Sequence, residues 1–427
     1  MKRILCVLCM VTLMLSAAGS AWAEGEGFTP ALDTSASITL LVAGHYDNFE
    51  AIEAEFALFR QYYPNVKLKY EKIDDYNNNI GKALRLGEEA PDIFFTYPSM
   101  VGQERFVRVF DAVEDLSDPA LGLDLSGIRS HLLLRSEDGK VFMLPIFCET
   151  YGMLVNEDIF EKENLQIPGT YEQLLQACEA LKSVGYSSPM LGFNGNSSNH
   201  FLLYPLFFPY FLAQIRENET AIAELNSLTP SAGEYMRGAL ELAADFMSRG
   251  YMDLEECNLL AKDYDPVILR FFEGDVPMML AKGGTVSGTE KRESRSEAFQ
   301  AHPFRYSFHP VPSTDEGGYF MDMVSMGFSV NQYSEKVDMA NEFIRFLVST
   351  NALNRMAQAK RMVTPCKDTS LDKIYAAFGQ LPPDHTINLA ELGLADAPDT
   401  QVRKAGWLVS NGMMTVDEAV AAFGTIE

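Results

Sequence analysis

Residues 37–97 read SITLLVAGHYDNFEAIEAEFALFRQYYPNVKLKYEKIDDYNNNIGKALRLGEEAPDIFFTY. This stretch alternates β-rich runs, at 37–43, 66–73 and 92–97, with two helical segments. The first helical segment has apolar side chains at helical spacing: Phe49, Ile52, Phe56, Phe59 and Tyr63. The second has Tyr76, Ile80, Ala83, Leu84 and Leu86, and Gly87 closes it. Strand and helix signals that alternate in this way predict an α/β fold whose sheet contains parallel strands.

The same alternation continues to the end of the chain. Strands are predicted at 141–146, 151–156, 275–281, 304–311 and 324–331. Helices are predicted after Thr170, after Thr229, over 334–350 and after Thr415, the first and last from capping-box patterns. Asp47 or Asn48 is expected to cap the first helix. Residues 283–297 are predicted as a polar, glycine-rich loop or cap, and 378–398 as irregular.

Length and charge limit the classes of function. The chain has 427 residues, 47% of them hydrophobic, which suits two to three globular domains. It contains 34 Lys and Arg against 59 Asp and Glu, for a formal net charge of −25, and no basic run. Nucleic acids and anionic membrane surfaces need a positive footprint, so neither is an expected partner.

The N-terminus has the pattern of a secretory signal peptide. Lys2 and Arg3 precede an apolar run at 4–15, and Ala21-Trp22-Ala23 forms the small-residue cleavage site. We therefore predict an exported protein, periplasmic or extracellular, with residues 1–23 removed. No Cys stands at the cleavage point, so lipid attachment is not expected. Four cysteines remain, Cys148, Cys178, Cys257 and Cys366, too few and too dispersed for a disulfide framework, although one pair stays open.

Catalytic and metal signatures are missing or incomplete. The sequence has no phosphate-binding G-x-x-x-x-G-K-[ST], no G-x-G-x-x-G after a strand, no H-E-x-x-H and no G-x-S-x-G. The six His are scattered. A calcium-like start at Asp75 lacks the glycine of such loops, because Ile80 stands in its place. We predict no cofactor, no metal and no enzymatic activity, while a glycosidase pair of carboxylates stays open among so many acids.

Seven segments, in order along the chain, resemble the extracellular solute-binding proteins of ABC sugar importers, the maltose-binding-like group. They are 59–68 (FRQYYPNVKL), 86–94 (LGEEAPDIF), 138–145 (DGKVFMLP), 154–160 (LVNEDIF), 167–175 (IPGTYEQLL), 272–278 (FEGDVPM) and 340–343 (ANEF). Each segment is weak alone, but their shared order from Ile38 to Ala422 is specific.

The resemblance implies two α/β lobes of the type II-like periplasmic-binding-protein fold, joined by a hinge that the chain crosses three times. We place the crossings near 146–149, 310–312 and 364–366. The N-terminal lobe is then 24–147 plus 312–363, and the C-terminal lobe is 148–311 plus 364–427. The resemblance also implies that ligand binding closes the lobes, and that the partners are a small solute and the ABC permease subunits of a monomeric binding protein.

Ligands of open α/β sheets bind at the carboxyl ends of strands. Applied to the two implied lobes and their crossings, this rule selects candidate ligand-binding residues. They are His45, Tyr46, Asp47, Tyr97, Ser99, Glu149, Tyr151, Asn194, Asn196, Asn199, Thr285, Asp322, Met323 and Arg361. Asp47 could equally be only a helix cap, and the three tyrosines could equally be packing residues of a lobe or the hinge.

A carbohydrate, most readily an oligosaccharide, is the favoured solute, because hydroxyl groups suit Asp, Glu, Asn and Arg side chains, and aromatic rings suit sugar faces. One departure from the family bears on this choice. Only Trp407 remains outside the signal segment, whereas sugar binders of the group usually present Trp in the cleft. Tyr can take that role, since the chain has 18. The alternatives are an exported carbohydrate-active enzyme and a ligand receptor of a sensor system.

Overall fold

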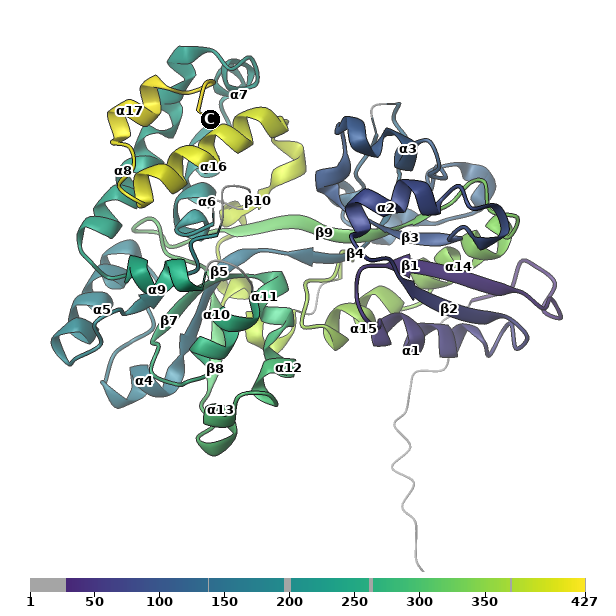
Figure 1. The fold of residues 1–427 in the computed structure, drawn as a ribbon, viewed down its shortest axis with the longest axis horizontal. Coiled ribbons are helices and arrows are strands. Elements are labelled where there is room, and N and C mark those ends of the chain that lie inside the picture. The colour runs from purple at the N-terminus through teal and green to yellow at the C-terminus, as the bar shows by residue number, and fades with distance from the viewer. Residues whose placement is uncertain (1–27, 137, 196–200, 261–263, 369–370, 427) are drawn as a thin grey trace, which may run out of the picture.

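The computed structural model describes residues 28–136, 138–195, 201–260, 264–368 and 371–426. These residues form two lobes connected by long strands, which Figure 1 shows side by side. The two-lobed α/β architecture confirms the predicted fold class. Cys148, Cys178 and Cys257 are free thiols, and all three are buried. Among the described residues, no helix is long and apolar enough to cross a membrane.

Lobe one is built on the segment 37–97. Its strands are β1 (Thr39–Gly44), β2 (Lys67–Lys72) and β3 (Ile93–Thr96), with β1 parallel to both neighbours as predicted. Its helices are α1 (Glu50–Phe59), α2 (Tyr76–Ala83), α3 (Val107–Phe110), α14 (Val337–Ser349) and α15 (Ala352–Ala359). Every member of the first predicted apolar stripe is buried. The rings of Phe56 and Phe59 pack edge-on against Phe343 of α14, which joins α1 to the C-terminal part of this lobe.

Lobe two holds a smaller sheet with the order β6-β7-β5-β8. Its strands are β5 (Tyr151–Asn156), β6 (Met190–Leu191), β7 (Met278–Lys282) and β8 (Tyr306–His309). Its helices are α4 (Glu157–Lys162), α5 (Tyr171–Ser183), α6 (Tyr204–Ile215), α7 (Glu219–Asn226), α8 (Arg237–Ser248), α9 (Leu254–Leu259), α10 (Tyr264–Phe271), α11 (Gly283–Ser287), α12 (Thr289–Glu293), α13 (Glu297–Ala301), α16 (Asp396–Ser410) and α17 (Val416–Ala421).

Short 3-10 helices fill the connections. They are η1 (Gly87–Glu89), η2 (Pro98–Met100), η3 (Glu104–Phe106), η4 (Pro119–Leu121), η5 (Leu125–Gly127), η6 (Ser130–Leu132), η7 (Pro230–Met236), η8 (Lys373–Tyr375), η9 (Phe378–Gln380), η10 (Pro383–His385) and η11 (Leu389–Glu391).

Three segments connect the lobes. β4 (Leu144–Glu149) leads directly into β5, and β9 (Phe320–Val330) returns to pair antiparallel with both β3 and β4. The third segment follows α15, where Val363 and Cys148 exchange backbone hydrogen bonds of 2.8 and 3.1 Å. β10 (Thr386–Asn388) adds to β9 from the lobe-two side. The lobe boundaries at 147/148, 311/312 and 363/364 stay a prediction.

Several local predictions differ from the structure. The sheets contain parallel strands as predicted, but they also contain antiparallel pairs, which the prediction did not include: β9 with β3 and β4, and β5 with β7 and β8. The segment after β7 is helical (α11 and α12) rather than a loop. Neither Asp47 nor Asn48 caps α1, since Phe49 holds the N-cap position without a side-chain bond. Thr229 opens the 3-10 helix η7, which leads into α8. The predicted capping box at Thr415 is present.

Candidate functional site

A cleft of about 1520 Å³ lies between the lobes. Lobe one contributes the β1–α1 turn, the first turns of α1 and the residues after β3. Lobe two contributes α11, α12, and the start of α16 with the turn that precedes it. The connecting strands β4 and β9 supply residues between the two walls. Both lobes and the connecting strands therefore line a single cleft.

Eight of the sequence-predicted residues line this cleft. They are His45, Tyr46, Asp47, Tyr97, Ser99, Glu149, Tyr151 and Met323. They come from the ends of β1, β3 and β4 and from the starts of β5 and β9, as the strand-end rule predicts for most of them. The structure therefore brings these residues together, and their contact with a ligand stays a prediction.

The lobe-one wall is an aromatic turn that begins at Gly44. A Cβ at this position would lie 2.4 Å from the Phe95 ring, so only glycine lets the chain turn over that ring. The turn places His45 beside Tyr97, and their side chains are hydrogen-bonded. Tyr46 stacks at a tilt on His45, with ring centroids 4.1 Å apart, and 38% of Tyr46 stays exposed. Tyr46 is thus an aromatic surface presented to the cleft.

Partial burial shifts the pKa values of Tyr46 and His45 on this wall. Burial, and to a lesser degree the negative charge of Glu149, raises the pKa of Tyr46 to about 12. Burial also lowers the pKa of His45, and Lys72 adds to the effect. Both groups are therefore neutral at pH 7, and both can donate or accept hydrogen bonds. Asp47 is exposed and pairs with Lys72 at 2.8 Å.

Glu149 fixes the junction between β4 and lobe two. Its Oε2 accepts a hydrogen bond of 3.0 Å from the backbone N–H of Gly284, at the start of α11. Its Oε1 lies 3.9 Å from Lys282 Nζ. A Cβ at Gly283 would lie 2.6 Å from the Cβ of Glu149, so the glycine here permits close approach of the backbone. One carboxylate thus lines the cleft and also positions α11.

The lobe-two wall contains residues that sequence reasoning missed. Arg403 of α16 lies 4.4 Å above the Tyr204 ring, donates a 3.0 Å hydrogen bond to its hydroxyl, and pairs with Asp399 at 2.9 Å. Tyr151 packs edge-on against the same ring at 4.9 Å. Asp396, at the first turn of α16, also lines the cleft. Burial, and secondarily Asp399, raises the pKa of Asp396.

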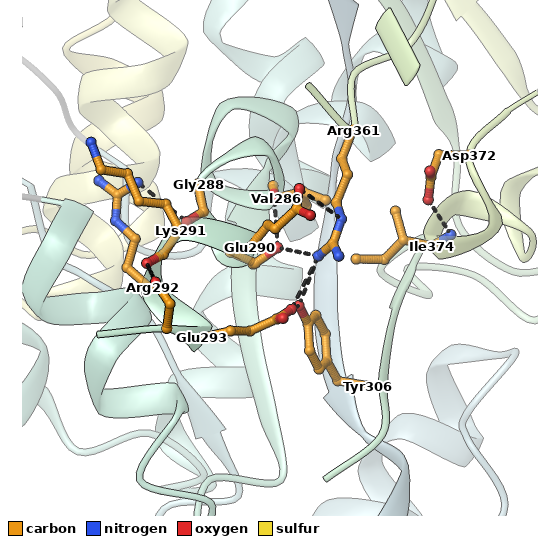
Figure 2. Close-up of polar contacts among 12 residues, drawn as sticks. Val286, Gly288, Glu290, Lys291, Arg292, Glu293, Tyr306, Arg361, Asp372 and Ile374 are labelled. Atoms are coloured by element: carbon orange, nitrogen blue, oxygen red, sulfur yellow. Dashed lines mark hydrogen bonds and ion pairs between the residues drawn. The ribbon is translucent and has the colours of Figure 1, made fainter. Parts of the chain in front are cut away.

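Four predicted residues lie outside the lining. Asn194 is buried among polar groups of lobe two and contacts Asn258 and Asn411. Thr285 is buried within α11. Asp322 is buried on β9, where Arg129 and His131 contact its two carboxylate oxygens. Arg361 reaches from the end of α15 to α12 of lobe two (Figure 2).

Two further predicted residues, Asn196 and Asn199, lie outside the described part of the chain. The structure brings no three His, Cys, Asp or Glu side chains into a metal-binding group within the residues it describes. The polar groups of the cleft are hydroxyls, carboxylates, ammonium and guanidinium groups set beside aromatic rings. Such a lining can hold a polyhydroxylated solute by many directional hydrogen bonds and one apolar face.

The chain is similar to known proteins in sequence and in fold. A family model described as bacterial extracellular solute-binding protein matches residues 43–352. No protein with a curated description matches in sequence.

Solved structures match over nearly the whole chain. A chitin oligosaccharide binding protein has a TM-score of 0.67 at 16% identity, covering 91% of this chain and 97% of that one. RafE from Streptococcus pneumoniae has 0.66 at 16%, covering 92% and 98%. The GacH receptor of Streptomyces glaucescens has 0.63 at 17%, covering 91% and 97%. At these identities the likeness concerns the fold.

Proposed function

Since the chain belongs to the family of bacterial extracellular solute-binding proteins, we propose that it captures a carbohydrate and delivers it to the permease of an ABC importer. The observation that carries the proposal is the cleft between the lobes, with the exposed ring of Tyr46 on one wall and the Arg403–Asp399 pair on the other. Capture is binding with lobe closure and involves no chemical step.

The chemistry of the lining supports a sugar. An oligosaccharide presents many hydroxyl groups, which both donate and accept, and a flatter face of C–H groups. Carboxylates accept from hydroxyls, while the guanidinium and ammonium groups donate to them. Tyr46 offers the apolar face that the family's tryptophans otherwise supply. The eight predicted lining residues, together with Arg403 and Asp399, form the proposed contact set.

Similar structures point in the same direction. One is a chitin oligosaccharide binding protein, another is RafE in complex with raffinose, and a third is GacH in complex with acarbose. The solute class is extended from those proteins to this chain as part of the proposal. So are the permease partner, the monomeric state, and export of the protein to the periplasm or the cell exterior after removal of residues 1–23.

Ligand screening by thermal unfolding tests this function. Residues 24–427 are heated with a panel of mono- and oligosaccharides, amino acids and peptides. A ligand at 100 times its dissociation constant adds about 2.7 kcal/mol to the free energy of unfolding, which corresponds to at least about two degrees in Tm. A shift with one class of sugar and no product by chromatography supports the proposal.

Other outcomes assign the protein elsewhere. A shift with an amino acid or peptide alone contradicts the carbohydrate. Product formation contradicts the non-enzymatic role and favours a carbohydrate-active enzyme. Unchanged sugar uptake in a deletion strain, with altered signalling, favours a sensor receptor over an importer.

Tyr46 provides the sharpest test of the site. Replacing it by Ala removes the exposed ring, and the loss of about 1 kcal/mol of aromatic contact predicts roughly fivefold weaker binding of the sugar found above. Tyr46→Phe keeps the ring and is expected to bind nearly as well. Tyr333→Ala is the matched control, since Tyr333 is 67% exposed and does not line the cleft. Equal affinity of Tyr46→Ala and wild type, by titration calorimetry, contradicts the assignment.

A further inference from the structure

Arg361 connects the two lobes beside the cleft. It follows α15 of lobe one, two residues before Val363, whose backbone pairs with Cys148 between the lobes. Its guanidinium reaches lobe two, where Nη1 lies 3.0 Å from Thr289 Oγ1, 3.0 Å from the Tyr306 hydroxyl and 3.2 Å from Glu293 Oε1. Figure 2 shows the guanidinium facing Glu290, Glu293 and Tyr306.

The acceptors around Arg361 are themselves held in place. Thr289 is fully buried and donates its hydroxyl hydrogen to the Val286 carbonyl at 2.7 Å, which leaves its oxygen free to accept from Arg361. The Tyr306 hydroxyl donates to Glu293 and accepts from Arg361. The two hydrogens of Arg361 Nη1 are thus shared among three acceptors. We call these four side chains, Arg361, Thr289, Glu293 and Tyr306, the Arg361 clasp.

The backbone of Arg361 closes the C-terminal end of α15. Its φ of +48° is in the left-handed region, which a non-glycine residue enters at a cost of order 1 kcal/mol. Its carbonyl accepts a 3.0 Å hydrogen bond from the hydroxyl of Tyr375, a fully buried residue of lobe two. The left-handed residue is a common way to end a helix, and here the N–H groups of Arg361 and Met362 donate to the carbonyls of Gln358 and Ala357 of α15, at 3.1 and 2.9 Å. The hydrogen bond from Tyr375 therefore joins this helix end to lobe two.

The chain on both sides of the clasp faces the cleft. Lys360 and Met362, the neighbours of Arg361, line it, and so do Glu290, Lys291 and Arg292 of α12, whereas Arg361 itself does not. Glu290 also lies 4.0 Å from Arg361 Nε. The clasp therefore holds one cleft wall, α12, against the segment at which the lobes are connected.

We propose that Arg361 is a positioning residue that sets solute affinity without touching the solute, by ordering α12 against the connecting segment. This inference rests on the proposed function, since it assigns a role in binding. A wall that is ordered before the solute arrives avoids the entropic cost of ordering it at binding. Because the clasp lies close to the paired backbone of Val363 and Cys148, it stays formed when the lobes rotate.

The test compares variants first without any solute. Amide hydrogen exchange of residues 283–293 is measured by mass spectrometry in Arg361→Ala, Arg361→Gly and Tyr306→Phe. The glycine variant removes the clasp while relieving the left-handed backbone, and the phenylalanine variant removes one clasp hydroxyl with the ring retained. Arg305→Ala is the matched control, because Arg305 pairs with Asp158 and Glu161 within lobe two, one residue before Tyr306.

We expect exchange in 283–293 to be at least tenfold faster in both Arg361 variants, faster to a smaller degree in Tyr306→Phe, and unchanged in Arg305→Ala. Affinity for the sugar identified in the screen is expected to fall about tenfold in the Arg361 variants. Unchanged exchange overturns the proposal. Unchanged exchange with weaker binding means that Arg361 contacts the sugar itself, and faster exchange with unchanged affinity means that α12 order does not set affinity. If the screen identifies no sugar, the hydrogen-exchange measurement still tests whether Arg361 orders α12. The proposed function and this inference can therefore fail independently of each other.

Discussion

Replacing Asp322 by Ala is predicted to destabilise the protein rather than to act first on binding. The side chain is 3% exposed on β9, with Arg129 Nη2 2.9 Å from one carboxylate oxygen and His131 Nε2 2.8 Å from the other. Arg129 also donates to the carbonyls of Thr364 and Cys366, at 2.8 and 2.7 Å. One guanidinium thus joins β9 to the segment after α15, two of the three connections between the lobes.

The magnitude follows from the charge that the substitution leaves behind. Removing one partner of a buried ion pair costs about 3–5 kcal/mol, because the other charge stays buried without compensation. Arg129 keeps its two carbonyl acceptors, and its side chain is 16% exposed. We therefore expect the free energy of unfolding to fall by the lower end of that range, about 3 kcal/mol. Asp322→Asn keeps the shape and one acceptor, and is expected to lose less.

Urea unfolding of the ligand-free protein measures this loss. The expected result is a lower midpoint with the slope m unchanged. In a double-mutant cycle with Arg129→Met, the two residues are expected to couple by at least about 1 kcal/mol. Asp138→Ala is the control, since that carboxylate is 60% exposed and pairs with Lys140 at 3.2 Å, and such an exposed pair contributes at most about 1 kcal/mol. Wild-type stability in Asp322→Ala would refute the reasoning, and with weakened sugar binding it would restore Asp322 as a ligand residue.

Two further substitutions test the packing of lobe one and its connection. Glu342→Gln is expected to lower the stability at pH 7. Burial raises the pKa of Glu342, but the Arg345 guanidinium, the Ala31 N–H and the Tyr63 hydroxyl together outweigh burial, and the folded pKa is lowered. The carboxylate's contribution to stability is therefore complete above about pH 5 and is lost as the pH falls through the lowered pKa. An unfolding series in which the difference in stability from wild type does not narrow in acid would contradict this. Gly327→Ala is expected to cost at least about 2 kcal/mol, since its Cβ would lie 2.5 Å from the Leu144 carbonyl oxygen, and a midpoint in urea equal to wild type would contradict it.

Local periodicity was enough to predict β1, α1, β2, α2 and β3 of lobe one. The apolar stripe of α1 follows helical spacing, and all of it is buried. The capping box at Thr415 depends on only four residues and forms as predicted. The segment after β7 was misjudged because Gly283 and Gly284 indicate a loop when taken alone. The structure uses Gly283 for close approach to Glu149 and continues at once into helix α11.

The residues of the candidate site also fall into two groups: those that local sequence patterns reveal, and those that reach the cleft only through packing between distant segments. The strand-end rule located the aromatic turn at Tyr46 and the junction at Glu149, because both follow directly from strands that the sequence reveals. It could not locate Arg403 and Asp399, whose helix α16 lies in the C-terminal part of the chain and packs on α6 and α8 of lobe two. Their spacing of four residues identifies a helical ion pair, but not the cleft beside it.

The predicted residues that fall outside the cleft share a physical feature. Asp322 and Arg361 each meet partners from distant parts of the chain, Arg129 at a separation of 193 residues and Thr289 at 72. Burying a charge without a partner is costly, so a charged side chain beside a connecting segment is buried only where the fold supplies a counter-ion or hydrogen-bond partners. The sequence shows that such a residue lies near the hinge. It does not show whether the folded chain already supplies the ion-pair or hydrogen-bond partners of that residue. The residues left for a solute are those that distant contacts leave exposed, as Tyr46 is, and the same distant contacts hold the walls on which those residues stand.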